Sequence, residues 1–299
     1  MERLEFDVLI IGSGAAGSYA AMQAAELGAK VAIVTKTKLL SGSTRWAQGG
    51  VAFPFNVNDI SIHLRDTITA GRGLVDANVR NTILTDGLYH LGKLIKLGMS
   101  FDAIPALEGG HSIPRVRHVN GDESGLHLLT FLHGRLSDEI TKFEQHYVAQ
   151  LLNDSGSVFG ALVWPGGNRE GAFEIRSHAT IIATGGAGQL YQVTTNPPES
   201  TGDGIALAYR SGAQIRDMEL VQFHPTVLAN GRLISEACRG EGAVLLTRDG
   251  TRFMESYDPA GELAPRDSVA RAIYNQEKIS ARRRKFATSA WSASIASDA

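Results

Sequence analysis

The sequence predicts an α/β fold that is built on a doubly wound, largely parallel sheet. Three observations support this prediction. The chain opens with a short apolar run that ends at a glycine-rich segment, an alanine-rich stretch follows, and a second apolar run comes next. Residues 179–186 later repeat the order of an apolar run followed by glycines. Continuous apolar runs of this length are typical of parallel strands that are buried on both faces.

Composition narrows the class of protein. The 299 residues are 43% apolar and 20% charged, which is typical of a soluble globular protein with a sizeable core. The formal net charge of -2 gives no reason to expect nucleic acid or a membrane as a partner. The single cysteine, Cys238, excludes an intramolecular disulfide and a multi-cysteine metal site. The N-terminus has no pattern of a signal peptide or a membrane span, so we expect a cytoplasmic protein.

The first predicted strand, Asp7–Ile11, leads into the G-x-G-x-x-G segment of residues 12–17. In this context Gly12 permits a tight turn, Gly14 allows the backbone to approach a pyrophosphate, and Gly17 allows close packing of helix and strand. The free N–H groups at the start of the following helix favour a phosphate. The predicted Rossmann-like site therefore contains Gly12, Ser13, Gly14, Ala15, Ala16 and Gly17.

The second predicted strand, Lys30–Val34, follows a helix that ends at Gly28. Folds that bind NAD commonly have an acidic residue at the end of this strand, where it binds a ribose hydroxyl. Thr35 and Lys36 stand at that place in this chain. Plain NAD binding is therefore disfavoured, and Lys36 is either a ribose contact or a solvated lysine.

The middle of the chain is predicted to contain two helices and a set of strands. Apolar residues have helical spacing from about Leu74 to Leu97, and a second helix is expected over residues 125–143. We expect His133 on a polar face of the second helix. No His, Asp or Glu cluster has the spacing of metal ligands, so no metal site is predicted. Residues 147–178 are interpreted as short antiparallel strands, and residues 179–184 as a returning parallel strand.

Several segments occur in the order seen in the succinate dehydrogenase and fumarate reductase flavoprotein family. They are GSGAAG, STRWAQGG, EGGHSIPRVRH, ATGGAGQLYQVTTNPPESTGDGIALAYRSGA, DMELVQFHPT, LISEACRGEGA and ELAPRDSVARAI. The chain resembles this family over residues 5–275, and the resemblance is greatest to the branch that oxidises L-aspartate. It implies an FAD-binding domain, expected over residues 1–230, and the start of an inserted capping domain that closes over a dicarboxylate, expected over residues 231–277.

The segment STRWAQGG, residues 43–50, has neither strand nor helix periodicity and would otherwise be a surface loop. The resemblance implies that it is a flavin-binding loop. In the succinate dehydrogenase branch a histidine of this loop is bonded covalently to the flavin, and the matching residue here is Ser43. Serine cannot form that bond, so noncovalent FAD is expected. The cofactor-binding residues that the resemblance adds are Lys36, Ser43, Thr44, Arg45, Trp46, Ala47, Gln48, Gly49, Gly50 and Asp203.

Glu108, in the EGGHS segment, distinguishes two classes of substrate. Glu108 places a negative charge beside a substrate that already has two carboxylates, which disfavours the binding of a plain dicarboxylate. The charge suits aspartate, whose ammonium group compensates for it. The resemblance matches Glu108 to the residue that binds the amine, His224 to a carboxylate ligand, and Ser235 and Glu236 to residues that contact the substrate. It matches Arg266 to the active-site acid or base. Without the resemblance, Glu108 would be interpreted as a solvated loop residue and Arg266 as a salt-bridged arginine at a helix start.

We therefore expect FAD-dependent oxidation of L-aspartate to iminoaspartate, with oxygen or fumarate as electron acceptor. This reaction is the first step of quinolinate and NAD synthesis, and quinolinate synthase is the expected protein partner. A fumarate reductase-like enzyme is a weaker alternative, which Ser43 and Glu108 disfavour.

An inactive, truncated flavoprotein fragment is the alternative from a different class. Residues 278–299 are rich in serine and alanine and stop resembling the family, and its later substrate ligands are missing. A truncated or frameshifted reading frame would produce such a tail, as would a divergent end. We favour the former.

Overall fold

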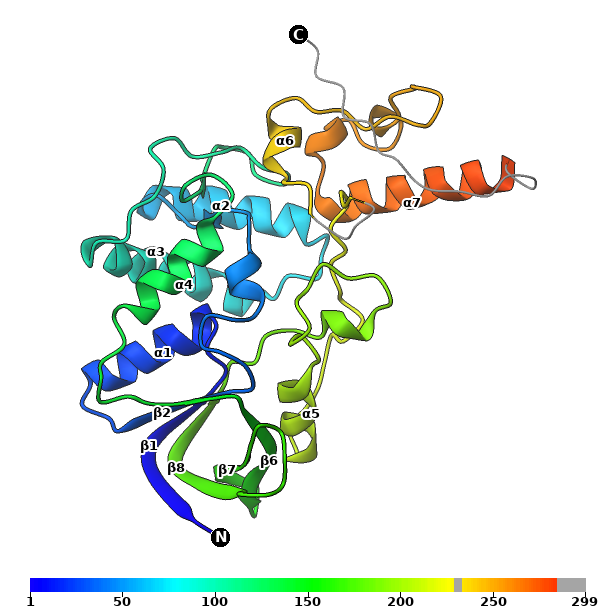
Figure 1. Cartoon of the computed structure of the whole chain (residues 1–299). Helices are drawn as coiled ribbons and strands as arrows, with labels where there is room; N and C mark the ends of the chain where they lie inside the picture. The colour runs from blue at the N-terminus through cyan, green and yellow to red at the C-terminus, as the bar shows by residue number, and fades with distance from the viewer. Residues whose placement is uncertain (229–232, 284–299) are drawn as a thin grey trace. The chain divides into compact units, whose positions relative to one another are not determined.

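The computed structural model describes residues 1–228 and 233–283 (Figure 1). The chain divides into two compact units. We call Met1–Ala47 with Gly125–Glu219 the sheet unit, and Gln48–Ser124 with the residues from Leu220 onward the helical unit. This division differs from the expected boundary at residue 230, because segments far apart in the sequence pack together within each unit. The expected domain assignment stays a prediction.

The sheet unit contains one mixed sheet of six strands in the order β5-β2-β1-β8-β7-β6. The strands β5, β2, β1 and β8 pair in parallel, and the hairpin of β6 and β7 continues the sheet in antiparallel pairing from β8 (Figure 1). This arrangement confirms the α/β fold class. The strand bounds are β1 (Arg3–Ile11), β2 (Val31–Thr35), β5 (Thr141–Glu144), β6 (His146–Asp154), β7 (Ser157–Pro165) and β8 (Phe173–Ile182).

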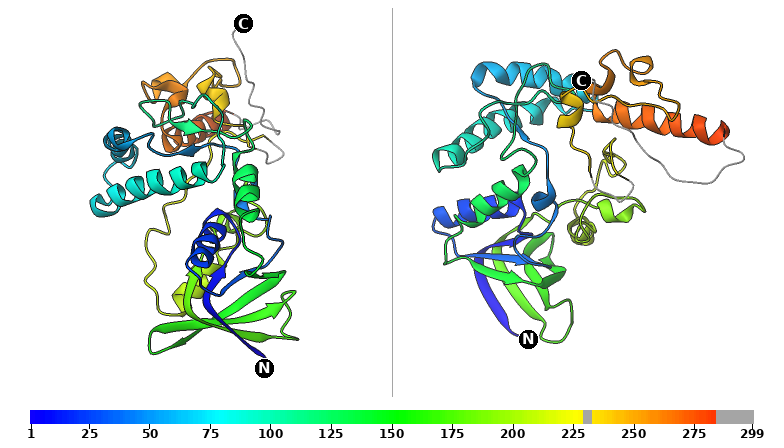
Figure 2. Two further views of the ribbon diagram at one scale, coloured as in Figure 1. Left: turned by 90° about the vertical axis from the view of Figure 1, so that its left-hand side faces the viewer. Right: turned by 45° about the horizontal axis from the view of Figure 1, so that its top comes forward.

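The two faces of β1 pack against different elements. Leu9 and Ile11 lie in one buried core with Val148 of β6 and Leu207 of α5 (Asp203–Arg210). The opposite face is covered by α1 (Ala15–Glu26), which contacts β1 and β2 (Figure 2). Because successive side chains of a strand point to opposite faces, the apolar run of β1 supplies both layers.

Two strands differ from the expectation. The helix expected over residues 125–143 is shorter: α4 (Ser124–His133) ends before Gly134, and Thr141–Glu144 forms β5 beside β2. β8 is one continuous strand, whereas two separate strands were expected. Its first half pairs with β7 on one side, and its whole length pairs with β1 on the other. Both differences depend on partners that are distant in the sequence.

The helical unit contains α2 and α3 and a short antiparallel pair of strands. The expected helix near residues 74–97 is present as α3, whereas α2 was not predicted. Asn56 caps α2, since its side chain accepts hydrogen bonds from the amides of Asn58 and Asp59. The bounds are β3 (Val51–Ala52), α2 (Val57–Ala70), α3 (Ala77–Lys96), β4 (Val116–Arg117), α6 (Ala237–Gly240), η3 (Met254–Ser256), η4 (Gly261–Leu263) and α7 (Arg266–Arg283).

The helix α7 begins directly after Pro265, as the sequence indicated. It continues to Arg283, so the first residues of the segment expected to be an atypical tail are helical. Residues 284–299, the rest of that segment, lie outside the described residues. Across the part of the chain that the structure describes, no helix is both long and apolar enough to cross a membrane.

Candidate functional site

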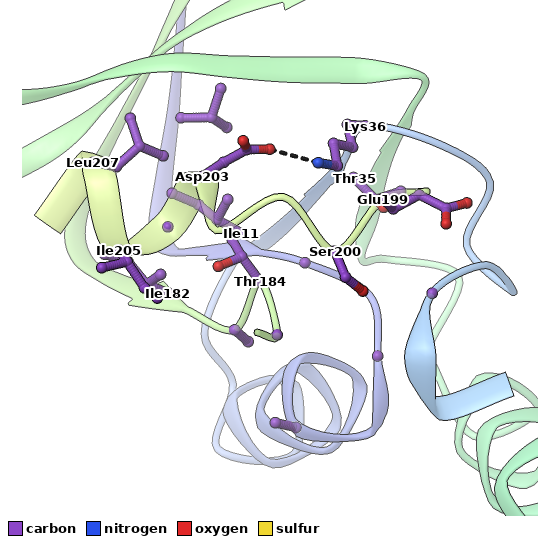
Figure 3. Close-up of a pocket in the computed structure, with 18 of the residues that line it drawn as sticks. Ile11, Thr35, Lys36, Ile182, Thr184, Glu199, Ser200, Asp203, Ile205 and Leu207 are labelled. Atoms are coloured by element: carbon purple, nitrogen blue, oxygen red, sulfur yellow. Dashed lines mark hydrogen bonds and ion pairs between the residues drawn. The ribbon is translucent and has the colours of Figure 1, made fainter. Parts of the chain in front are cut away.

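A cavity of about 630 Å³ lies in the sheet unit, at the carboxyl ends of β1 and β2 (Figure 3). Ligands of open α/β sheets bind at this edge. The stretches that line the cavity include the loop after β1, the end of β2 with the residues that follow, the start of β6, the loop after β8 and the start of α5. The predicted residues that line it are Gly12, Ser13, Gly14, Ala15, Ala16, Lys36, Ser43, Thr44 and Asp203.

The glycine-rich loop is shaped by close backbone packing. Gly12 has φ +109°, and a Cβ there would lie 2.3 Å from the carbonyl oxygen of Ala183. A Cβ on Gly17 would lie 2.0 Å from the carbonyl oxygen of Gly12. Gly14, the N-cap of α1, provides no side-chain hydrogen bond to the first turn. The positive end of the helix dipole therefore faces the cavity, where it favours a phosphate.

Lys36, which follows β2, lines this cavity and pairs with the start of α5. Its Nζ lies 2.5 Å from Oδ2 of Asp203 (Figure 3). The same Nζ lies 2.6 Å from Oγ1 of Thr201. Thr201 also donates to Oδ1 of Asp203 at 2.8 Å. Lys36 is therefore not a solvated lysine, and an acidic residue does stand at this edge. Asp203 comes from a different part of the chain than the end of β2.

His133 does not lie on a polar face as expected. The residue is half-buried, and its Nε2 lies 3.1 Å from the carbonyl oxygen of Ser13 and 2.9 Å from Oγ of Ser18. Burial lowers the pKa of His133. Ser13 also donates through Oγ to the carbonyl of Leu39 at 2.9 Å. His133 and Ser13 thus attach α4 and the residues after β2 to the glycine-rich loop.

The expected flavin loop, residues 43–50, starts as a short 3-10 helix, η1 (Ser43–Trp46). Its first turn faces the cavity: Oγ of Ser43 lies 2.9 Å from Oγ of Ser200, and Oγ1 of Thr44 accepts a hydrogen bond from the amide of Ala15. The next residues do not line the cavity. Arg45, Trp46 and Ala47 are exposed, and Gln48, Gly49 and Gly50 belong to the helical unit.

Sequence reasoning missed other residues that line the cavity. Thr35, Thr37, Tyr147, Val148, Glu199 and Ser200 are among them. Glu199 and Ser200 lie inside the segment that carried the family resemblance, which is the one signal that could have indicated them.

A cluster of charged side chains lies in the helical unit, and it joins α6 to α7. Glu236 accepts a hydrogen bond from Nε of Arg266 through Oε2, while its Oε1 lies 3.0 Å from Nη2 of Arg239. Nη1 of Arg266 also donates to Oε1 of Gln222 at 3.2 Å. Burial lowers the pKa of Arg239 despite the nearby carboxylate. Two guanidinium groups thus share the single carboxylate of Glu236.

Glu108 is buried, with 7% of its surface exposed, and is not a solvated loop residue. Its Oε1 lies 2.8 Å from Nε2 of His118, which is also buried. The neighbouring Gly109 packs against the charged cluster, because a Cβ there would lie 2.9 Å from Oε1 of Glu236 and 2.9 Å from the carbonyl oxygen of Ala264. The structure therefore brings Glu108 to the same cluster as Glu236.

His224 and Ser235 complete the set that was predicted for the substrate. Burial, and secondarily the positive charge of Arg266, lowers the pKa of His224 to about 4. His224 is therefore neutral near pH 7 and can donate or accept a hydrogen bond. Ser235 donates through Oγ to Oδ1 of Asp122 at 2.9 Å. The cluster thus offers two guanidinium groups, a neutral histidine and a hydroxyl as possible donors to an anionic ligand.

Among the residues that the structure describes, no group of three or more His, Cys, Asp or Glu side chains could hold a metal ion.

The comparison with protein families decides the kind of protein. Residues 7–293 match the family described as "FAD binding domain". The chain belongs to this FAD binding domain family. The cofactor of the family fits the sheet unit, since Gly12 and Gly17 leave no room for a Cβ and the start of α1 lines the cavity. FAD is therefore the cofactor of this chain.

The curated proteins that are similar in sequence to this chain include L-aspartate oxidases. The protein from Streptomyces coelicolor is 42% identical over 285 residues, which are 89% of this chain and 49% of the relative. The protein from Synechocystis is 43% identical over 285 residues, which are 90% of this chain and 50% of the relative. The chain thus spans about half the length of these relatives.

Solved structures of related flavoproteins share the fold. Quinol fumarate reductase from E. coli has a TM-score of 0.87 at 30% identity, and the match covers 99% of this chain and 54% of that chain. Sdh1 from Mycobacterium smegmatis has a TM-score of 0.77 at 34% identity, covering 93% of this chain and 51% of that chain. These similarities confirm the flavoprotein fold that the sequence resemblance predicted.

Proposed function

We propose that this chain serves the FAD-dependent oxidation of L-aspartate to iminoaspartate. The observation that carries the proposal is Glu108, a buried carboxylate beside a cluster that contains two arginines. A carboxylate at this place opposes the binding of a plain dicarboxylate and favours a ligand that also has an ammonium group. The similarity to L-aspartate oxidases supports the same substrate class.

Each unit of the chain has its own part in this proposal. In the sheet unit the glycine-rich loop would hold the pyrophosphate of FAD, and Lys36 with Asp203 would contact its nucleotide part. Bound FAD supplies the acceptor for a hydride from the substrate. In the helical unit His224, Ser235 and Arg239 would bind the carboxylates. Arg266, whose Nε is held by Glu236, is the proposed acid or base.

The finer parts of the proposal concern the acceptor and the partner. Fumarate or oxygen would accept the electrons, and quinolinate synthase would use the iminoaspartate. A cytoplasmic location is also part of the proposal.

Glu108→Gln tests the choice of substrate. The variant keeps the shape of the side chain but loses one charge-assisted hydrogen bond to the ammonium, which is worth about 1.5–3 kcal/mol. We expect the oxidation of L-aspartate, measured as peroxide release with added FAD, to fall about 10- to 100-fold. Fumarate reduction, measured with a reduced dye, should change much less. Equal losses in both reactions would show that Glu108 does not bind the amine.

Arg266→Leu is the matched control, because it removes a residue proposed for both reactions. It should abolish both, while bound flavin stays at the wild-type level. A wild-type chain that binds FAD but oxidises no L-aspartate would favour the alternative, an inactive flavoprotein fragment.

Noncovalent attachment of FAD is a separate prediction. Ser43 stands where a tethering histidine would be needed, and its hydroxyl lies 2.9 Å from that of Ser200. Acid precipitation of the FAD-loaded protein should therefore leave the yellow colour in the supernatant. Colour that stays in the washed pellet would contradict the prediction.

A further inference from the structure

The pair of Glu108 and His118 has a geometry that restricts where its protons lie. Both residues are 7% exposed, and Nε2 of His118 lies 2.8 Å from Oε1 of Glu108. The other ring nitrogen, Nδ1, lies 3.1 Å from the carbonyl oxygen of Gly121. Both nitrogens of the ring therefore face oxygen atoms.

The carbonyl oxygen of Gly121 and Oε1 of Glu108 determine how many protons the ring of His118 carries. A carbonyl oxygen can only accept a hydrogen bond, so Nδ1 of His118 must carry a hydrogen. An ionised carboxylate also only accepts, so Nε2 must carry a hydrogen as well, unless Glu108 itself is protonated. A protonated Glu108 would leave no carboxylate for the ammonium of the ligand, so the proposed function requires the ionised form. The pair is then an imidazolium ion beside a carboxylate.

Arg239 is also the competing partner for Glu108. Its Nε is buried and has no hydrogen-bond partner within the described residues. A Glu108 side chain that lost His118 could turn to this guanidinium, because a buried charge requires a partner of opposite sign. Glu108 would then be turned toward Arg239, and its oxygens would no longer be held in place for a ligand.

We propose that His118 is the residue that makes the site selective for amino dicarboxylates. Doubly protonated, it holds Oε1 of Glu108 and so keeps the second carboxylate oxygen available for the ammonium of the ligand. His118 acts through Glu108, as a positioning residue, and does not itself touch the substrate. The inference rests on the proposed function, because it concerns the recognition of the same amine.

The proton count can be tested without any ligand. Histidine labelled with nitrogen-15 is introduced into the 299-residue chain, and the ring signals of His118 are assigned by their loss in His118→Gln. In neutral buffer we expect both ring nitrogens to show the shifts of N–H groups. In Glu108→Gln we expect the ring of His118 to become neutral, so that only one of its two nitrogens shows the shift of an N–H group. A neutral ring in the wild-type protein would overturn the proposal.

The selectivity is tested by the affinities for L-aspartate and succinate, which differ by the ammonium group. For His118→Phe we expect the affinity for L-aspartate to fall about tenfold or more, the loss of one charge-assisted hydrogen bond. The affinity for succinate should change much less, because succinate has no ammonium group for Glu108 to bind. His118→Gln, whose amide can still donate to Glu108, should recover part of the selectivity. His178→Gln, at a ring that is 88% exposed, is the matched control.

The outcomes are distinguishable. A parallel loss of affinity for both ligands in His118→Phe, with the fold intact by circular dichroism, would reduce His118 to a structural role and overturn the proposal. If His118→Phe does not fold, His118→Gln distinguishes the positioning role from the structural role. A larger loss of affinity for L-aspartate than for succinate supports the positioning role, and equal losses overturn it. A wild-type chain that binds neither ligand contradicts the proposed function, and the ring signals of His118 then still decide the state of the pair.

Discussion

Two neighbouring glycines, Gly49 and Gly50, differ in the reason for having no side chain. A Cβ on Gly50 would lie 2.6 Å from the carbonyl oxygen of Arg117 and 2.7 Å from Cγ1 of Val116. The contact of the backbone with β4 therefore explains Gly50 within the helical unit. A Cβ on Gly49 would meet no atom within 4 Å. Packing does not explain Gly49, and the predicted approach of the flavin remains a reason that can be tested.

The paired variants Gly50→Ala and Gly49→Ala separate packing from cofactor binding. Gly50→Ala should lower the free energy of unfolding by about 1–3 kcal/mol, because the methyl group overlaps β4. Gly49→Ala should change it by less than about 0.5 kcal/mol. Urea denaturation measures both. We expect Gly49→Ala to weaken FAD binding, measured by the quenching of flavin fluorescence. Wild-type FAD affinity in this variant would remove Gly49 from the predicted cofactor-binding residues.

At the scale of elements, buried charges attach α2 to the segment that carries Glu108. The side chain of Arg115 is 0% exposed, and its Nη2 lies 3.0 Å from Oδ1 of Asp59 on α2. Nη1 of Arg115 pairs with Asp66 on the same helix. The ring of His63, also on α2, packs edge-on against His111, with ring centroids 5.5 Å apart. The helix that sequence reasoning missed is therefore the support of the predicted substrate segment.

The protonation of His63 should destabilise this element in acid. Burial, and secondarily the charge of Arg115, lowers the pKa of His63 from 6.5 to about 4. As the pH falls, the unfolded chain binds this proton first, so stability is lost from pH 6.5 down to about 4 and is unaffected by this group above that range. The loss amounts to at most about 3 kcal/mol.

His63→Leu should remove this part of the pH dependence. Chemical denaturation at several pH values measures the difference between the variant and the wild type. His178→Gln, at an exposed ring, should retain the wild-type dependence. If the curves of His63→Leu and the wild type run parallel from neutral pH to about pH 4, His63 is not the group that titrates.

At the scale of the whole molecule, the two proposed ligand sites belong to different units. The described residues that line the cavity all lie in the sheet unit. The charged cluster of Glu108, Glu236, Arg239 and Arg266 lies in the helical unit. Each unit is assembled from two separate stretches of chain, so each site combines residues that are far apart in the sequence.

Hydrogen exchange should show this separation. FAD should slow amide exchange in residues 12–17 and 200–204 of the sheet unit, since a ligand at 100 times its Kd adds about 2.7 kcal/mol to the stability of the state that binds it. L-Aspartate should slow exchange in residues 106–118 and 234–240 of the helical unit. Mass spectrometry of peptic fragments measures both. Protection by FAD that is confined to the helical unit would contradict the placement of the nucleotide site.

The candidate site was predictable to different degrees at different residues. Gly12 and Gly17 could be assigned because the strand, the glycines and the helix are consecutive in the chain. Glu108 and Arg266 could be named only through the family resemblance, since a lone acidic or basic residue has no local signature. The partner of Glu108, His118, was not named at all, because nothing in its own neighbourhood distinguishes it from a solvated histidine.

The α/β class and the glycine-rich loop could be inferred from the sequence, because they depend on residues that are close together in the chain. The family could be inferred as well, because its motifs are short segments that occur in a characteristic order. The sequence also showed that Ser43 stands where a flavin tether would be. The folded structure was needed to show that Thr141–Glu144 is a strand, that Lys36 pairs with Asp203, and that Glu108 is buried against His118. Strand partners and buried ion pairs form between distant segments, and the free energy of these contacts outweighs the local preference of each segment.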